Sequence, residues 1–281
     1  MCGCGYSLCD DKFWQLVSVL QEIVASKSLR LCGMVGIYPA NSVGDDIQVY
    51  EHDDARDAPL ATFHGLRQQA DKDGDDPFMC ISDFVAPKET GLRDYLGMFA
   101  NAAFGAEALV ARYKEAGDDY NHIMVDAIAD RLAEVWVPVP RIIITGITIR
   151  TQAFAEKLHE LLRKELWGYA PDEQLSTDDL LKVRYRGIRP APGYPSQPDH
   201  TEKRTMWELM GVKEATGMDL TESMAMLPAA AVSGLYFAGA CSSYFAVGKI
   251  TQDQVVDYAR RKRISVEEAQ KWLAPMLNYE P

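Results

Sequence analysis

The chain has 281 residues, of which 47% are hydrophobic and 25% are charged, a composition typical of a globular protein with a sizeable core. Its formal net charge of −12 disfavours nonspecific binding to nucleic acid or to an anionic membrane surface. No apolar run is long enough to span a bilayer and no secretory signal is visible, so we expect a cytoplasmic protein. Among the six cysteines, Cys2, Cys4 and Cys9 could suggest a metal cluster, but their spacing fits no zinc-binding pattern and no His lies near them, so no metal site is expected.

The first half of the chain mixes helical and strand patterns. Apolar residues at helical spacing predict helices over four segments: 12–27, 63–71, 91–116 and 119–134. Runs of apolar and β-branched residues predict strands over three segments: 31–38, 47–50 and 79–85. Residues 39–46 contain Pro39 and Gly44 and are predicted as the turn between the first two strands.

Residues 135–152 do not resemble their surroundings, because they contain no acid, two prolines (Pro138 and Pro140) and many β-branched residues. They interrupt two stretches that both read as helix, so we interpret them as an insert. One interpretation is an added strand or hairpin. The other is a translated intron, since the codons of Val135 and Gln152 are compatible with splice junctions. The residues alone leave both open.

The second half repeats this mixture. Helices are predicted over 154–167, 176–182, 199–215, 251–263 and 265–273, and strands over 220–226, 232–237 and 244–250. Asp199 with Glu202 three residues later is typical of a capping box. The four cations at 260–263 suit the negative end of a helix better than a nucleic-acid patch. Together the elements indicate an α+β fold with mainly antiparallel strands.

Four prolines fall between residues 189 and 198, and each fixes φ and removes an N–H group. The segment is therefore a stiff, extended loop, which we call the proline loop. It carries Arg189, whose planar cation suits a carboxylate, and Gly193, which lets backbone approach a partner closely. Tyr194 adds an aromatic ring with a polar tip. The residues alone fit a small-molecule clamp and a rigid connector about equally well.

Other residues that carry chemistry by type are Glu134 and the pair Tyr244 and Phe245. On a strand, Tyr244 and Phe245 point to opposite faces, so at most one lines a given pocket. Without further information, aromatic residues in the core and at its rim explain this pair better than a binding site does.

Several motifs occur in an order that resembles the C-terminal activation domain of cobalamin-dependent methionine synthase. In the first half they are Gly65-Leu66-Arg67-Gln68-Gln69, Ser82-Asp83-Phe84, Asp94-Tyr95-Leu96-Gly97 and Asp130-Arg131-Leu132-Ala133-Glu134. In the second half they are residues 186–195, 198–203, 220–223, 232–237 and 244–250. The match covers 12–281, leaves 1–11 as an unmatched N-terminal segment, and excludes the insert at 135–152. The resemblance implies a single C-shaped domain with a twisted, mainly antiparallel sheet flanked by helices.

The resemblance also implies a function. The family domain binds S-adenosylmethionine and presents it to cobalamin, which another domain holds, so that inactive cob(II)alamin is reductively remethylated. A flavoprotein reductase, flavodoxin-like or methionine synthase reductase-like, supplies the electron. The domain thereby supports methyl transfer from methyltetrahydrofolate to homocysteine in methionine biosynthesis. Cobalt and the sulfonium carry the chemistry, so no catalytic residue of the chain is expected.

The implied ligand-binding residues follow from the matched motifs. Arg189 pairs with the carboxylate of the ligand, and the backbone of Pro190, Ala191, Pro192, Gly193 and Tyr194 holds its adenosine and amino groups. Tyr244 lines the pocket with Phe245 beside it, and Glu134 lies near the methionine end.

The sequence departs from the family in one segment. The family's Asp-Trp-x-Pro-Phe-Phe segment, whose Asp contacts the ligand, has no match, and neither do the homocysteine, folate and cobalamin domains. We therefore expect a fragment of a methyltransferase or a truncated gene model. The alternatives are a stand-alone regulatory protein that binds S-adenosylmethionine, and a fragment without function.

Overall fold

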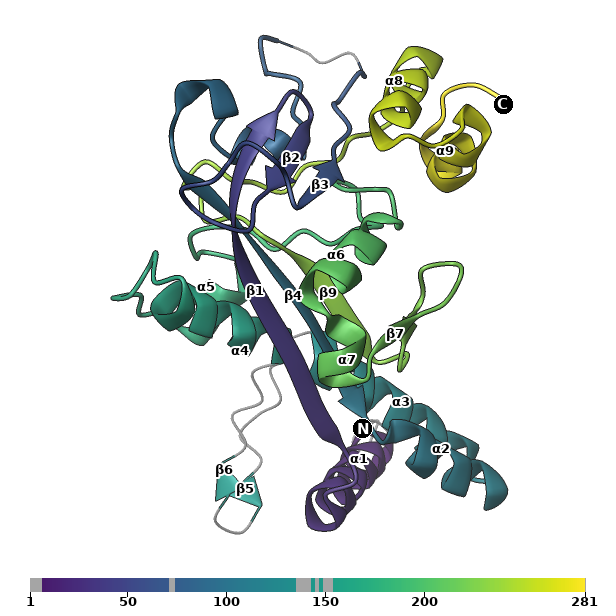
Figure 1. Cartoon of the computed structure of the whole chain (residues 1–281). Helices are drawn as coiled ribbons and strands as arrows, with labels where there is room; N and C mark the ends of the chain where they lie inside the picture. The colour runs from purple at the N-terminus through teal and green to yellow at the C-terminus, as the bar shows by residue number, and fades with distance from the viewer. Residues whose placement is uncertain (1–6, 71–73, 135–142, 145–146, 149–153, 281) are drawn as a thin grey trace. The chain divides into compact units, whose positions relative to one another are not determined.

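The computed structural model describes residues 7–70, 74–134, 143–144, 147–148 and 154–280. Its main sheet has the strand order β3-β2-β1-β4-β9 (Figure 1). The strands are β1 (Arg30–Val43), β2 (Asp46–Val49), β3 (Ala61–His64), β4 (Asp94–Phe104) and β9 (Ala231–Tyr236). The helices are α1 (Ser7–Ser26), α2 (Ala106–Glu115), α3 (Asp119–Glu134), α4 (Phe154–Leu161), α5 (Thr177–Leu181), α6 (Glu202–Met210), α7 (Val212–Thr216), α8 (Gln252–Lys262) and α9 (Val266–Leu273). The prediction of an α+β fold with a mainly antiparallel sheet flanked by helices is confirmed.

The chain divides into two compact units. One, which we call the helical unit, comprises Met1–Gly33, Asn101–Glu160 and Met226–Val232. The other, the sheet unit, comprises Met34–Ala100, Leu161–Ala225 and Ser233–Pro281. Among the described residues, no helix is both long and apolar enough to cross a membrane.

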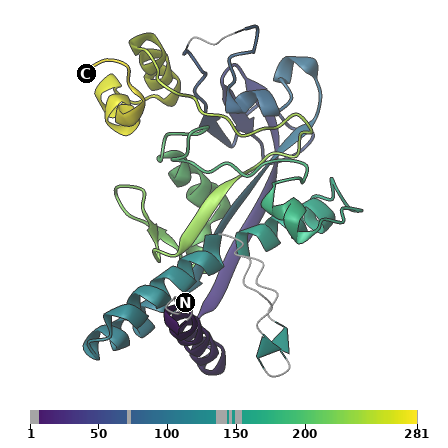
Figure 2. The ribbon, with the colours of Figure 1, turned by 180° about the vertical axis from the view of Figure 1, so that it is seen from behind.

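The helical unit is built around α1, α2 and α3, and α2 and α3 lie side by side in both views (Figures 1 and 2). Its core mixes large aliphatic side chains with alanines, which let the helices approach closely. The buried members are Val19, Ile23, Ala103, Ala106, Leu109, Val110, Val125, Ile128, Ala129 and Ala230. At the surface, the Tyr113 hydroxyl donates to Glu22 at 2.6 Å, and Arg112 pairs with the same carboxylate. Tyr113 is therefore the main cause of the lowered pKa of Glu22, with Arg112 second.

In the sheet unit, β2 pairs antiparallel with β1 on one side and with β3 on the other. Ile47, Val49 and Phe63 are buried there, because alternate side chains of a strand point to the same face. Near the C-terminus, α8 and α9 form a second apolar cluster with the segment before them. Its buried members are Leu66, Val247, Ile250, Val255, Tyr258, Ala259, Ala269, Leu273 and Leu277.

Three predicted elements of the first half are wrong in type. Residues 94–104 form the central strand β4 and not the first part of a helix over 91–116. Eight consecutive residues of this strand are buried, which removes the alternation that identifies a strand and leaves a run of small apolar residues. Ala61–His64 is a strand where the helix 63–71 was expected to begin, and Ile81–Phe84 is a 3-10 turn within the predicted strand 79–85. Strand β1 also continues to Val43, through most of the predicted turn 39–46.

The second half agrees better. Helices α4, α5, α8 and α9 and strand β9 lie where they were predicted. The predicted helix 199–215 begins at Glu202 and is divided at Gly211, and the predicted strand 220–226 is a hairpin of β7 (Asp219–Leu220) and β8 (Met226–Leu227). Residues 244–249 form no regular strand.

The predicted insert at 135–152 lies mostly outside the described residues. Its described parts are β5 (Ile143–Ile144) and β6 (Ile147–Thr148), which pair antiparallel. Cys2 and Cys4, two of the cysteines weighed as metal ligands, also lie outside the described residues. Among the side chains that the structure describes, no group of three or more His, Cys, Asp or Glu residues could hold a metal ion.

Candidate ligand-binding site

The proline loop is held at both of its ends by the backbone of neighbouring segments. The N–H of Leu235 in β9 donates to the Pro190 carbonyl at 2.8 Å, and the N–H of Val247 donates to the Pro195 carbonyl at 2.8 Å. Within the loop, Gly193 N–H donates to the Gln197 carbonyl at 2.7 Å. Fixed φ angles and these hydrogen bonds give the loop one shape before any ligand arrives.

The backbone donors of the loop are almost all in use. Arg189 N–H donates to the Tyr244 hydroxyl at 3.0 Å, and Tyr194 N–H donates to the Ala191 carbonyl at 3.1 Å. The prolines have no N–H. Within the part of the chain that the structure describes, Ala191 N–H is the backbone donor between residues 189 and 194 without a hydrogen-bond partner. This group is free to meet an acceptor on a ligand.

Arg189 stands on a layer of aromatic and charged groups. Its Nη1 donates to the Tyr185 hydroxyl at 2.9 Å, and its guanidinium lies 5.8 Å from the centre of the Tyr185 ring. Arg163, which is fully buried, lies 4.3 Å from the same ring and binds Glu173 through Nε and Nη2 at 2.8 to 3.0 Å. A buried guanidinium needs such a carboxylate partner to be stable. The layer therefore limits the positions that Arg189 can adopt.

Tyr244 and Phe245 divide their roles between the surface and the interior. Tyr244 is 51% exposed, and its hydroxyl oxygen accepts the hydrogen bond from Arg189 N–H. Phe245 is half-buried and packs edge to face against Phe84, with ring centres 5.9 Å apart. The Nε2 group of Gln68 donates to the neighbouring Ala246 carbonyl at 2.7 Å and ties this segment to residues 65–69. The structure thus brings Tyr244 next to Arg189 and directs Phe245 to Phe84.

Gly193 and His200 meet at the turn of the proline loop. Gly193 has φ +97°, a conformation that side chains rarely adopt. A Cβ at this position would lie well within 3.0 Å of the His200 ring, so the imidazole fills the space of the missing side chain. Tyr194 follows with 62% of its surface exposed. The glycine is required for its backbone angle and for the ring behind it.

A buried ionic cluster, made of Asp199, Glu202, Tyr258 and Lys262, lies directly after the loop in the sequence. The Lys262 ammonium donates to Asp199 at 2.8 Å and also binds Glu202, and the Tyr258 hydroxyl donates to Asp199 at 2.6 Å. Both carboxylates are almost completely buried. Burial opposes ionisation of Asp199, but Lys262 and the hydrogen-bond donors outweigh it, so the pKa of Asp199 lies below its usual range. For Glu202 burial prevails and raises the pKa.

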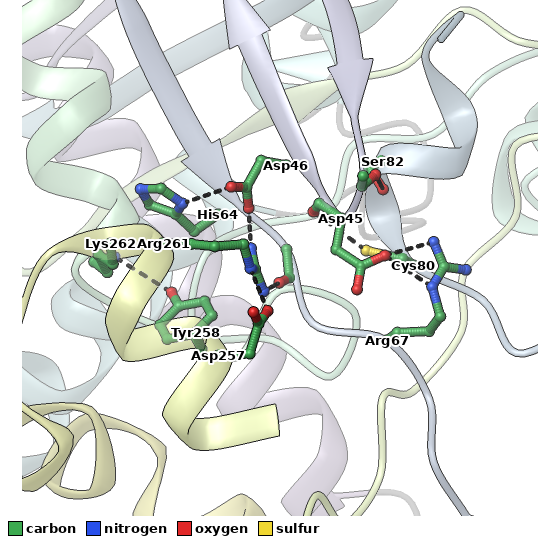
Figure 3. A network of polar contacts seen from close by, with 12 residues as sticks. Asp45, Asp46, His64, Arg67, Cys80, Ser82, Asp257, Tyr258, Arg261 and Lys262 are labelled. Atoms are coloured by element: carbon green, nitrogen blue, oxygen red, sulfur yellow. Dashed lines mark hydrogen bonds and ion pairs between the residues drawn. The ribbon is translucent and has the colours of Figure 1, made fainter. Parts of the chain in front are cut away.

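A further group of ion pairs lies next to Tyr258 and Lys262 of this cluster (Figure 3). Arg261 pairs with Asp46 and, through Nε at 2.7 Å, with Asp257, and Asp46 lies 3.2 Å from Nδ1 of His64. Burial opposes the charge of Arg261, yet these carboxylates raise its pKa. The side chains of Arg261 and Lys262 therefore enter the interior, where the sequence predicted only charges at the end of a helix.

Arg67 belongs to the other polar group in Figure 3. It binds Asp45 and Asp83, each at 2.8 Å, and its own backbone N–H and carbonyl pair with the side chain of Gln254. Burial raises the pKa of the neighbouring Cys80 thiol to about 11, which makes this thiol unreactive at neutral pH. Residues 65–69 therefore connect the sheet to α8 through hydrogen bonds.

Glu134 is the last residue of α3 in the helical unit, whereas the proline loop belongs to the sheet unit. The described residues include its backbone but not its side chain, so its predicted role stays a prediction. Three residues at the site were missed from the sequence: Tyr185, Gln68 and His200. No spacing pattern in the sequence identifies Tyr185 or Gln68. The partner of Gln68, Ala246, is distant in sequence, and Tyr185 is separated from its partner Arg189 by a turn. His200 directly follows the proline loop in the sequence, and this position could have identified it as a candidate site residue.

An α+β domain that displays a guanidinium, an exposed tyrosine and a free backbone N–H along one stiff loop has the make-up of a small-molecule-binding domain. The comparison with protein families is more specific. The model described as "Vitamin B12 dependent methionine synthase, activation domain" matches residues 12–138 and 141–263, and the chain belongs to that family.

A solved structure supports the same assignment. It is the "Crystal Structure of the MetH Reactivation Domain bound to AdoHcy", which is 45% identical in sequence to this chain. The match covers 99% of this chain and 83% of that one, with a TM-score of 0.88. The predicted family and fold are thereby confirmed.

Proposed function

We propose that the chain binds S-adenosylmethionine on the proline loop and presents its methyl group for the reductive remethylation of cobalamin. The observation that carries this proposal is that the 45% identical structure was solved with AdoHcy, the compound that S-adenosylmethionine becomes when it loses its methyl group. The stiff loop of this chain offers groups that match the chemistry of that ligand.

Each part of the ligand finds a complementary group. Arg189 offers a guanidinium for the carboxylate, and its support by Tyr185 reduces the entropy lost on binding. Ala191 N–H offers a donor, and the exposed rings of Tyr194 and Tyr244 offer faces for the adenine or the sulfonium. Pro190, Pro192 and Gly193 shape the backbone between them. In this proposal Phe245 lies beside Tyr244, and Glu134 lies near the methionine end of the ligand.

The chemistry itself is supplied by other groups. Cobalamin, bound by another domain of methionine synthase, would supply the cobalt that accepts the methyl group, and a flavoprotein would be the source of the electron. The residues of this chain hold the ligand and orient its sulfonium. They support methyl transfer to homocysteine only indirectly, because reductive remethylation returns inactive cobalamin to the catalytic cycle of the enzyme.

Isothermal titration calorimetry of the folded chain with S-adenosylmethionine tests the proposal. We expect saturable binding, and we expect Arg189→Ala to weaken it by about 1.5–3 kcal/mol, the usual value of a hydrogen bond to a charged group. Arg184→Ala is the matched control, because Arg184 is 60% exposed and pairs with Asp179. Absence of binding by the folded wild-type chain would falsify the proposal.

A further inference from the structure

His200 and Lys203 form a hydrogen-bonded pair that has no role in the proposed function. Lys203 is only 6% exposed, and its ammonium lies 3.0 Å from Nδ1 of His200 and donates to the Met224 carbonyl at 2.9 Å. Both partners are neutral. Among the described residues, none provides a carboxylate within ion-pair distance of Lys203.

The pair determines which nitrogen of the imidazole carries the proton. A lysine ammonium has three N–H donors and no acceptor, so Nδ1 of His200 must accept the hydrogen bond. A neutral imidazole with Nδ1 as acceptor carries its proton on Nε2. The exposed His200 ring therefore offers an Nε2–H donor, in the tautomer that Lys203 selects.

Charge reinforces this assignment. The charged groups that face His200 are Lys203 from α6 and Asp199 from the preceding turn. Burial and the Lys203 ammonium lower the pKa of His200, and they outweigh Asp199, whose carboxylate is already bound to Lys262 and Tyr258. The imidazole is thus neutral at pH 7, and Nε2–H donates without adding a positive charge beside the sulfonium of the proposed ligand.

The ring also lies at a defined place on the loop. It packs against Gly193, which follows Arg189 by four residues on the same loop. A ligand whose carboxylate meets Arg189 places a different part of itself at Gly193. For S-adenosylmethionine that part is the nucleoside, which carries hydroxyl and ring-nitrogen acceptors but no charge.

We propose that His200 is a further ligand-binding residue, whose Nε2–H donates a hydrogen bond to the nucleoside of the bound ligand, and that Lys203 is the positioning residue that fixes its tautomer. This inference rests on the proposed function. It also explains how the two ends of the ligand are distinguished. The neutral donor of His200 recognises the nucleoside end, and the cation of Arg189 recognises the amino-acid end.

Nuclear magnetic resonance of ¹⁵N-labelled imidazoles tests the tautomer in the wild-type chain without ligand. We expect a protonated Nε2 and an unprotonated Nδ1 on His200 at pH 7. In Lys203→Met, the acceptor role of Nδ1 is no longer enforced, so both tautomers should be populated. A wild-type His200 protonated at Nδ1 overturns the inference even if the ligand binds.

Titrations test the contact itself. Adenosine should shift the Nε2 signal of His200, and methionine should not. His200→Ala should weaken S-adenosylmethionine binding about 2- to 10-fold, and His200→Gln, which keeps an N–H donor, should recover part of the loss. His52→Ala is the control, because the side chain of His52 is 66% exposed and its ion-pair partner is Glu51.

The two proposals fail in different ways. If the wild-type chain binds no S-adenosylmethionine, the proposed function fails and the ligand contact of His200 with it. If the wild-type chain binds and His200→Ala binds equally well, only the role of His200 is overturned.

Discussion

The proline loop and the buried ionic cluster stand next to each other in the chain but are held rigid by opposite means. In the loop, four prolines restrict the chain before it folds, and backbone hydrogen bonds hold its ends once it has folded. In the cluster, Asp199 and Glu202 share the single ammonium of Lys262, which comes from α8, about sixty residues further along. The loop depends on local covalent geometry, and the cluster depends on a long-range ion pair.

This difference predicts different consequences of mutation. Changes to Arg189 or Tyr194 in the loop should alter ligand affinity with little loss of stability, because neither side chain is buried. Changes in the cluster should alter stability, because an unpaired buried charge is costly. The experiments below separate these two kinds of rigidity.

The largest effect is expected for Lys262→Met. This change leaves two carboxylates buried without their cation, and removing one partner of a buried ion pair costs about 3–5 kcal/mol. Urea denaturation of both proteins measures the difference in the free energy of unfolding.

Arg260→Met is the matched control on the same helical turn. Arg260 is 74% exposed and pairs with Asp257 at the surface, so the loss should stay below about 1 kcal/mol. Equal losses for the two variants would show that the cluster contributes no more than a surface pair.

The sequence predicted these two regions unequally, for the same physical reason. Proline and glycine restrict the backbone wherever they occur, so the shape of the proline loop could be read directly. The cluster was misread: Asp199 and Glu202 were taken as a capping box, yet Asp199 Oδ1 accepts from Thr201 N–H and Glu202 turns inward to Lys262. No local sequence pattern can identify an ion-pair partner that lies sixty residues away in the chain.

Strand β4 shows the same limit in the fold. A strand buried on both faces has no alternation, and its alanines favour a helix by intrinsic propensity. Helices α3, α8 and α9 were predicted well because each keeps one polar face. The family resemblance, carried by motifs, predicted a ligand and the residues that would hold it, whereas periodicity predicted neither.

The next largest effect is expected for Gly193→Ala, which tests the loop where it meets His200. The new methyl group would suffer the unfavourable φ of +97° and a clash with the imidazole, so we expect a loss of about 1–3 kcal/mol in ligand binding. Calorimetry with S-adenosylmethionine measures it.

Gly248→Ala separates the two causes, because Gly248 has φ +76° and open space around its missing side chain. In a His200→Ala background, Gly193→Ala should cost less affinity than it does in the wild-type chain, by the part of the loss that is due to the clash. An equal cost in both backgrounds would mean that backbone strain alone explains the effect.

A smaller effect is expected for Tyr244→Phe. The hydroxyl of Tyr244 accepts the hydrogen bond from Arg189 N–H, and its removal should cost about 0.5–1.5 kcal/mol of ligand affinity while the aromatic face remains. Tyr120→Phe is the control, since Tyr120 is an exposed residue of α3. An unchanged affinity for Tyr244→Phe would mean that the loop keeps its shape without this contact.

The smallest effect should appear in the pH dependence of stability, through Lys203. Burial lowers the pKa of its ammonium below the unfolded value of about 10.5. Between the two pKa values the unfolded chain binds more protons than the folded chain, so this group makes the wild-type protein more stable as the pH rises. Lys203→Met should remove that increase.

Lys213 provides the opposite sign in the same experiment. Its exposed ammonium is hydrogen-bonded to Asp219 at 2.6 Å, which raises its pKa. Its contribution is therefore present at neutral pH and is lost as the pH rises through the raised pKa. Denaturation curves from pH 7 to about 11 should show a flatter rise for Lys203→Met below the unfolded pKa of about 10.5, and a smaller loss of stability for Lys213→Met above it. If both variants shift the slope in the same direction, then the Lys203 ammonium is not held in the interior without a carboxylate, and the tautomer it imposes on His200 loses its physical basis.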